Sequence, residues 1–150
     1  MISLICEKYN ITNYTINPDG SIDVNGNVYL YNKELTELPL TFNKVSGYFT
    51  CSNNRLTSLK GCPRWVGGFF SCYRNKLTSL EFSPEYVGSN FYCYNNDLID
   101  NYCESEIGGH FCTNLKQEGL IINEYNIVIN YKEFQKLYKR KLILNDIFNM

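Results

Sequence analysis

The chain has 150 residues, with 14 Lys and Arg, 15 Asp and Glu and one His, and a formal net charge of −1. It is 44% hydrophobic and 15% aromatic, which supplies enough apolar material for a core and argues against disorder. A nearly neutral chain has no overall field that would favour nucleic acid or an anionic membrane, and we expect a single domain over residues 1–150.

Two local elements are expected before the centre of the chain. Residues 3–9 predict a short helix. Residues 14–17 and 21–24 carry β-branched residues on both sides of a Pro-Asp-Gly turn, which predicts a β-hairpin. The side chains of the helix expected to face inward are Leu4, Ile5 and Tyr9.

A repeat of 21 residues organises the centre of the chain. A set of Phe, Cys, Asn and Leu recurs in register as Phe49, Cys51, Asn54 and Leu56, then Phe70, Cys72, Asn75 and Leu77, then Phe91, Cys93, Asn96 and Leu98. A degenerate first copy has Val28, Leu30, Leu35 and Leu38. The fourth copy is one residue shorter and predicts a last strand around 110–113. Self-similarity at such a period indicates a solenoid.

Alternation along each repeat predicts which side chains face the core. In Phe70-Ser-Cys72 the Phe and the Cys face inward, so parallel stacking at about 4.8 Å makes buried rows of Phe and of Cys. The pairs Gly67-Gly68 and Gly108-Gly109 fit a tight bend into the strand, where glycine tolerates a positive φ.

The last third of the chain changes character. Residues 120–123 and 125–129 are β-prone, and a helix is expected from Tyr131 to about Asn145, with Ile147 and Phe148 folding back onto it. Its predicted apolar face comprises Tyr131, Phe134, Leu137, Tyr138 and Leu142. Its basic face comprises Lys132, Lys136, Lys139 and Arg140. We interpret the basic face as a solvated outer surface; docking of nucleic acid or an acidic protein is the alternative.

The repeat unit resembles a leucine-rich repeat. It is most similar to the short, Pro-containing repeats of bacterial effectors and to small repeat proteins of bacteriophages and large viruses, over about residues 24–114. The resemblance implies an α/β repeat solenoid of short parallel strands, with an N-terminal β-hairpin cap in residues 1–23 and a C-terminal helical cap in residues 115–150. It also implies that Asn54, Asn75 and Asn96 satisfy backbone groups at the turns.

The cysteines invite a metal-site hypothesis. Zinc needs four converging ligands, usually from close Cys pairs, and the sequence has neither C-x-x-C nor H-E-x-x-H. We therefore interpret the Cys row as small buried hydrophobes, place Cys62 and Cys103 near the outer bends, and expect no metal; Cys112 with His110 is the alternative ion site. Seven cysteines and no secretory signal at the start favour free thiols in a cytoplasmic setting.

No catalytic constellation is visible. His110 is the single histidine, no Ser-His-Asp or Cys-His pair can be assigned by spacing, and no Gly-rich phosphate loop stands between a strand and a helix. We expect no enzyme activity and no cofactor.

The outward-facing side of the repeat strands is the candidate site. The resemblance makes this side the concave face, and it has no charged residue. Its members are Tyr29, Tyr31, Tyr48, Thr50, Ser52, Phe69, Ser71, Tyr73, Asn90, Tyr92, Tyr94 and His110. The expected anchors are Tyr48, Phe69, Tyr73, Tyr92 and Tyr94. Tyrosine is common on any half-buried β surface, but an uncharged, Tyr-rich patch is also what protein interfaces favour.

These features predict a non-catalytic module that binds a partner protein, with no membrane and no nucleic acid as partner. The resemblance to phage and viral proteins suggests a host-interaction or counter-defence inhibitor. The alternative is a structural subunit of a virion or another large assembly. The sequence leaves the oligomeric state and the identity of the partner open.

Overall fold

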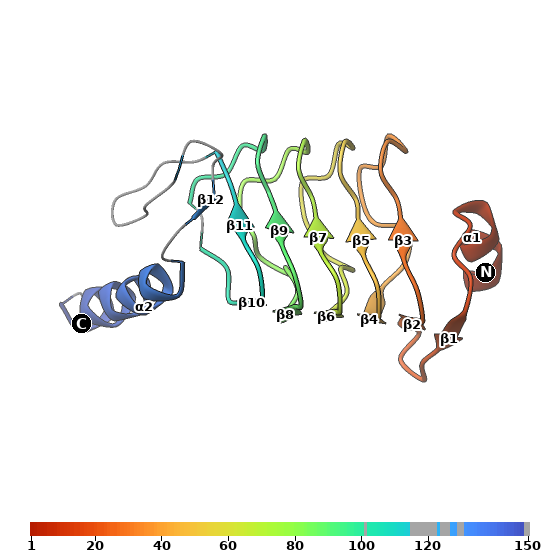
Figure 1. The fold of residues 1–150 in the computed structure, drawn as a ribbon, viewed down its shortest axis with the longest axis horizontal. Coiled ribbons are helices and arrows are strands. Elements are labelled where there is room, and N and C mark those ends of the chain that lie inside the picture. The colour runs from red at the N-terminus through yellow and green to blue at the C-terminus, as the bar shows by residue number, and fades with distance from the viewer. Residues whose placement is uncertain (101, 115–122, 124–126, 129–130, 149–150) are drawn as a thin grey trace.

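The protein is a β-solenoid of short repeats followed by a helix, as Figure 1 shows. A computed structural model describes residues 1–100, 102–114, 123, 127–128 and 131–148. The elements are α1 (Ile2–Lys8), β1 (Tyr14–Ile16), β2 (Ile22–Val24), β3 (Val28–Tyr29), β4 (Phe42–Val45), β5 (Phe49–Thr50), β6 (Trp65–Val66), β7 (Phe70–Ser71), β8 (Tyr86–Val87), β9 (Phe91–Tyr92), β10 (Glu106–Ile107), β11 (Phe111–Cys112), β12 (Ile127–Val128) and α2 (Tyr131–Phe148).

Each repeat contributes one strand to each of two sheets. Sheet A has the order β1-β2-β4-β6-β8-β10, and sheet B has the order β12-β11-β9-β7-β5-β3. The predicted solenoid of parallel strands with a C-terminal helix is therefore confirmed. The expected α/β character is not, because the segments predicted as bends contain the strands of sheet A, and the molecule is mostly β.

The register between turns follows the predicted repeat. Val28 pairs with Phe49, Phe49 with Phe70, Phe70 with Phe91, and Phe91 with Phe111, all in parallel. The last step spans 20 residues, so the shortened fourth repeat keeps its place in the ladder, and the predicted last strand is β11. The same alternation makes Val45, Val66 and Val87 an inward row of sheet A.

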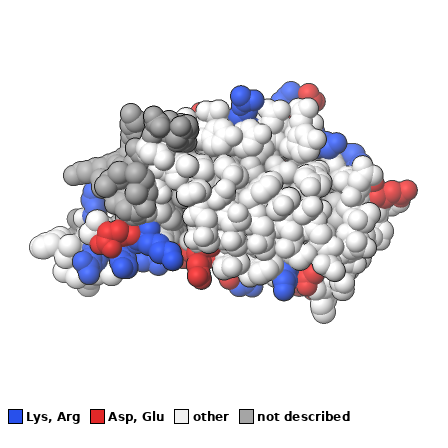
Figure 2. All heavy atoms as spheres, viewed as in Figure 1, with Lys and Arg blue, Asp and Glu red and all other residues white. Residues whose placement is uncertain are grey.

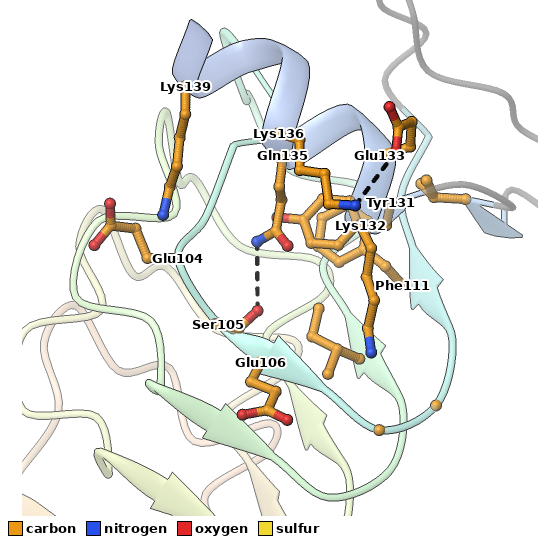
Figure 3. Close-up of a pocket in the computed structure, with 14 residues that line it drawn as sticks. Glu104, Ser105, Glu106, Phe111, Tyr131, Lys132, Glu133, Gln135, Lys136 and Lys139 are labelled. Carbon is orange, nitrogen blue, oxygen red and sulfur yellow. Dashed lines mark hydrogen bonds and ion pairs between the residues drawn. The ribbon is translucent and has the colours of Figure 1, made fainter.

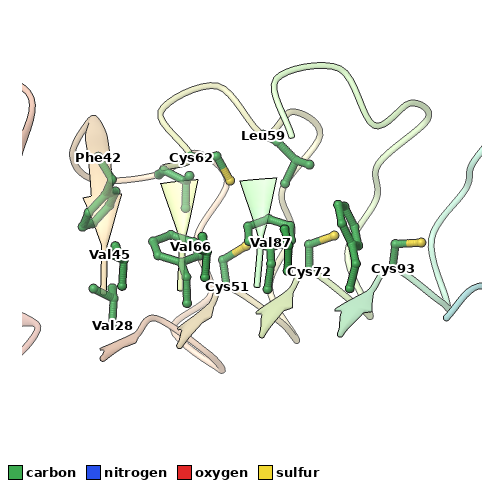
Figure 4. Packing of buried hydrophobic residues seen from close by; sticks show 14 of the residues in the cluster. Val28, Phe42, Val45, Cys51, Leu59, Cys62, Val66, Cys72, Val87 and Cys93 are labelled. Carbon is green, nitrogen blue, oxygen red and sulfur yellow. The ribbon is translucent and has the colours of Figure 1, made fainter. Parts of the chain in front are cut away.

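The core lies between the two sheets and consists of rows of like side chains (Figure 4). The centroids of the Phe49 and Phe70 rings lie 5.8 Å apart at an angle of 9°, and Phe70 and Phe91 meet edge to face at 4.9 Å. The row of Cys51, Cys72 and Cys93 is completely buried. Cys62 and Cys103, which were predicted near the outer bends, are also buried, and Cys62 directly follows the turn at residues 60–61.

Asn54, Asn75 and Asn96 each join their own turn to the preceding one. The Asn75 Oδ1 accepts a hydrogen bond from the Leu56 N–H (3.0 Å), and its Nδ2 donates to the carbonyls of Cys51 (3.0 Å) and Cys72 (3.1 Å). Asn54 makes the equivalent bonds one turn earlier, including two to the N–H groups of Lys33 and Leu35. The first turn therefore closes without an Asn of its own, because Asn54 reaches back to it.

Replacing Asn75 by Ala tests this arrangement. The change leaves the buried Leu56 N–H without a partner and removes one of two amide donors from each of the Cys51 and Cys72 carbonyls, which keep their bonds to Asn54 and Asn96, so we expect the free energy of unfolding to fall by about 2 kcal/mol. The exposed Thr57→Ala is the control and should change it by less than about 0.5 kcal/mol. Urea denaturation measures both. An Asn75→Ala protein as stable as Thr57→Ala would contradict the role.

The glycines between the two sheets are required by close packing. A Cβ at Gly67 would lie 2.2 Å from the carbonyl oxygen of Ser46, and one at Gly88 would lie 2.2 Å from that of Gly67. The expectation of a positive φ at Gly67-Gly68 and Gly108-Gly109 is wrong, because none of these residues has one. The left-handed corner after each sheet B strand is instead occupied by Asn32, Asn53, Arg74 and Asn95, whose φ angles are 53° to 56°.

The N-terminal end combines a helix and an antiparallel strand. The predicted hairpin strands pair as β1 and β2, and β2 also begins the parallel ladder with β4. Helix α1 buries Cys6, and the following Ile11 is 3% exposed. The predicted inward direction of Leu4 is wrong, because this side chain is 70% exposed.

The C-terminal helix docks on the last turn through two tyrosines. Tyr131 lies 20 residues after Phe111, and its ring stacks on that of Phe111 at 4.2 Å, so it acts as the next member of the Phe row. Its hydroxyl accepts from the Cys103 N–H (3.0 Å) and donates to the Cys103 carbonyl (3.1 Å). Tyr138 stacks on Tyr102 at 4.4 Å. At the same end of sheet B, strand β12 pairs antiparallel with β11.

Other expectations for this end differ from the structure. Leu137 and Leu142 were predicted to face the core but are 46% and 44% exposed. Ile147 and Phe148 do not fold back; they continue α2 and are exposed. The β-prone residues 120–122, 125–126 and 129 and the side chain of Phe134 lie outside what the structure describes.

Tyr131 should decide whether α2 stays docked. Tyr131→Ala removes the stacked ring and its hydrogen bonds, and we expect a loss of about 3–4 kcal/mol in the docking of α2. Hydrogen exchange should then show α2 amides exchanging much faster while the amides of β5 and β7 keep their protection. Leu137→Ala is the matched control on the same helix and should leave exchange unchanged. Equal exchange in both variants would contradict the anchoring role.

Candidate functional site

The outward-facing residues of sheet B form a regular surface, which we call the sheet B face. Because neighbouring strands are in register, its residues fall into three rows along the solenoid. The first row is Asn27, Tyr48, Phe69, Asn90 and His110. The second is Tyr29, Thr50, Ser71, Tyr92 and Cys112, and the third is Tyr31, Ser52, Tyr73, Tyr94 and Asn114. Every residue predicted for partner binding belongs to these rows.

The aromatic members of the sheet B face surround a small buried centre. Tyr29, Tyr31 and Tyr48 are 48%, 55% and 43% exposed, and Phe69, Tyr73, Tyr92 and Tyr94 are partly exposed. Three residues predicted to be exposed are buried instead: Thr50, Ser52 and Ser71. They are short side chains among large neighbours. The Phe69 and Tyr92 rings, which meet diagonally at 5.9 Å, illustrate how rings reach across this centre.

The buried centre has its own hydrogen bonds. The hydroxyl oxygens of Ser52 and Ser71 lie 2.7 Å apart, and the Thr50 hydroxyl donates to the Ser52 oxygen at 3.3 Å. These hydroxyls are buried and hydrogen-bonded to one another beneath the aromatic residues of the surface.

Stacking fixes the orientation of the rings. The rings of Tyr48 and Phe69 lie 4.4 Å apart at an angle of 11°, and those of Tyr73 and Tyr94 lie 4.8 Å apart at 8°. These separations match the spacing of neighbouring strands, so the rings stack along the solenoid axis. Within each pair, one face of each ring covers one face of the other, and ring edges and hydroxyl groups remain available to a partner.

Two asparagines, one near each end of the sheet B face, each bond to a tyrosine hydroxyl and to a backbone N–H. The Asn90 Nδ2 donates to the Tyr92 hydroxyl at 2.7 Å, and its Oδ1 accepts from the backbone N–H of His110 at 2.8 Å. Asn27 makes the corresponding bonds to the Tyr29 hydroxyl (3.1 Å) and the Tyr48 N–H (2.8 Å). The sequence analysis missed the role of Asn27, although its place one repeat before Tyr48 was the available signal.

Charge distinguishes the two faces of the solenoid. No residue in the three rows of the sheet B face is charged, and Figure 2 shows a broad uncharged area over strands β3 to β11 with charges at its rims. The outward row of sheet A instead contains Asp23, Lys44, Trp65, Tyr86 and Glu106. There, the Lys44 ammonium lies 4.6 Å from the Trp65 ring, and Arg64 pairs with Glu85 at 2.7 Å.

Six of the seven thiols lie in the hydrophobic core, and Cys112 is a buried member of the sheet B face. All seven cysteines are free and buried. Removal from water raises the pKa values of Cys62, Cys72 and Cys93 well above the usual value for a thiol, which suppresses the nucleophilic thiolate. Among the described residues, no group of three or more His, Cys, Asp or Glu is placed to hold a metal ion.

Burial predicts slow chemistry for these thiols. In the native protein we expect the aromatic disulfide reagent of Ellman to react at least about tenfold more slowly than in the unfolded chain, because the thiols are buried. Leu4→Cys places a thiol at a site that is 70% exposed in α1 and should add one fast equivalent. A fast equivalent in the unmodified native protein would contradict the burial.

The predicted residue His110 is exposed at the end of the first row. Its backbone N–H donates to the Asn90 Oδ1, and its carbonyl accepts from the Phe91 N–H, both at 2.8 Å. No helix in the described part of the chain has the length and apolar character to span a bilayer. Comparisons with known protein families, curated proteins and solved structures find no match. The leucine-rich repeat and viral resemblances therefore rest on the sequence pattern alone.

Proposed function

We propose that the protein is a non-catalytic interaction module that binds a partner protein on the sheet B face. The observation that carries the proposal is an uncharged surface of stacked aromatic rings on one sheet of a two-sheet solenoid. Tyr and Phe cover large areas with few rotatable bonds, and rings already held by stacking lose little freedom on binding. Such a surface suits a specific interface.

The orientation of the rings favours protein over other ligands. Nucleic-acid bases bind aromatic side chains by stacking on a free ring face, and in the Tyr48–Phe69 and Tyr73–Tyr94 pairs one face of each ring is already covered by its partner, which leaves fewer faces for bases. The same face has no Lys or Arg to neutralise phosphate. Ring edges with hydroxyl groups can instead pack against apolar side chains and hydrogen-bond to backbone carbonyls of a protein.

The viral resemblance extends this proposal. If the chain acts in an infected host, the partner is a host protein in the cytoplasm, and occupation of the sheet B face would recruit or inhibit that protein. This extension rests on the sequence resemblance and on no structural feature.

The double variant Tyr73→Ala, Tyr92→Ala tests the proposal. The full chain is used to capture partners from a host-cell lysate, and the purified partner is then titrated calorimetrically against each variant. Loss of two anchors of about 2 kcal/mol each should weaken binding at least about 100-fold. Tyr86→Ala is the matched control, because Tyr86 is a partly exposed, stacked tyrosine on the opposite sheet.

Circular dichroism confirms that each variant keeps its fold before titration. A partner that binds the Tyr73→Ala, Tyr92→Ala protein as tightly as the Tyr86→Ala protein would contradict the proposed site. Hydrolysis or modification of the partner by the chain would instead contradict the non-catalytic assignment.

A further inference from the structure

Sheet A ends in an open edge at β10, whereas sheet B continues from β11 to β12. The Glu106 N–H donates to the Glu85 carbonyl, and the Gly108 N–H donates to the Val87 carbonyl, both at 2.8 Å. Successive residues of a parallel strand direct their backbone groups to opposite sides. The N–H and C=O of Ile107 therefore point away from β8, and no described residue pairs with them.

Helix α2 forms the opposite wall of this edge. A hollow of about 820 Å³ lies between the helix and residues 104–109, and Figure 3 shows it. The Gln135 Nε2 donates to the carbonyls of Cys103 (2.7 Å) and Ser105 (3.4 Å). Gln135 of the helix thus hydrogen-bonds to carbonyls just before β10, and no described residue of the helix bonds to the main chain of Ile107. The N–H and C=O of Ile107 are thus a donor and an acceptor in the hollow that no described residue uses.

Unpaired cations line the helix side of the hollow. Lys132 and Lys139 point from α2 toward the last turn (Figure 3), and neither forms an ion pair within the described part of the chain. Lys136 is paired with Glu133 at 3.7 Å. The carboxylate of Glu106 belongs to the outer row of sheet A and points away from the helix. The helix wall that an added strand would face carries three lysines and Glu133 and so has a net positive charge, while Glu104 of the last turn lies opposite Lys139.

We propose that an extended, acidic segment of a partner protein adds to β10 as a further strand of sheet A. Its main chain pairs with the N–H and C=O of Ile107, and a carboxylate of the segment meets Lys132 or Lys139. Main-chain pairing at a sheet edge supplies affinity, and the side chains beside it supply specificity. This surface is separate from the sheet B face, so the two proposals stand or fall independently.

A second copy of the chain fits this edge less well. Its own β10 would bring a second α2 with the same lysines against the first. The strand at the other edge of sheet A, β1, is Tyr-Thr-Ile and offers no carboxylate. Charge therefore favours a different chain that carries Asp or Glu.

The probe is a panel of acetylated and amidated hexapeptides of alternating Thr and Val with one Asp, added to the full chain labelled with ¹⁵N. We expect the backbone amide signals of residues 106–109 and the first turns of α2 to shift. Replacing the Asp of the best peptide by Lys should weaken binding at least about tenfold, since two lysines would then repel it.

Protein variants separate the main-chain and charge contributions. Ile107→Pro removes the outward N–H but no bond to β8, whereas Ile107→Ala loses much of the side chain and keeps that N–H. We expect the Pro variant to lose at least about tenfold in affinity relative to the Ala variant. Lys132→Glu, Lys139→Glu should weaken binding similarly, and the distant, exposed Lys60→Glu should not.

Four outcomes would overturn the proposal. They are the absence of peptide-induced shifts at residues 106–109, equal binding of the Asp and Lys peptides, equal binding to Ile107→Pro and Ile107→Ala, and sedimentation of the free chain as a dimer that the same variants dissociate. The last result would assign the edge to a second copy.

Discussion

The parallel register between turns is the constraint on which the rest of the structure depends. Each sheet B strand donates to the carbonyls of the next turn, as from Phe49 to Phe69 and from Phe70 to Asn90, both at 3.0 Å. At this spacing every position must fit directly above its predecessor. Like side chains therefore form rows, glycine is needed where the backbones approach, and Asn75 can bridge two turns with one side chain.

The same register that builds the core also arranges the surface. Inside, it stacks Phe and Cys into rows that exclude water; outside, it stacks Tyr73 on Tyr94 and Tyr48 on Phe69. The outer rings are held by their neighbours before any partner arrives, which lowers the entropy cost of binding. The turns at the ends differ from the inner turns, because no further turn is present there to complete the hydrogen-bond ladders and the side-chain rows. Tyr131 completes the Phe row, and β10 keeps an open edge.

Sequence reasoning predicted the repeat, its register and the outward aromatic residues, because each recurs at a fixed spacing. It missed sheet A because β6 and β8 each lie between a Pro and a Gly, residues that are typical of bends. It placed Thr50 and Ser71 at the surface, since burial of a short side chain depends on how its neighbours lean. It also assigned too much of α2 to the core: the helix has 18 residues, and only its first half meets the last turn.

The central claim is that the sheet B face is where the partner binds. Hydrogen exchange of the complex, compared with the free chain, tests it most directly. The account predicts new protection of backbone amides in and beside β5, β7 and β9, with little change in β4, β6 and β8. Protection confined to sheet A, or to α1, would contradict it.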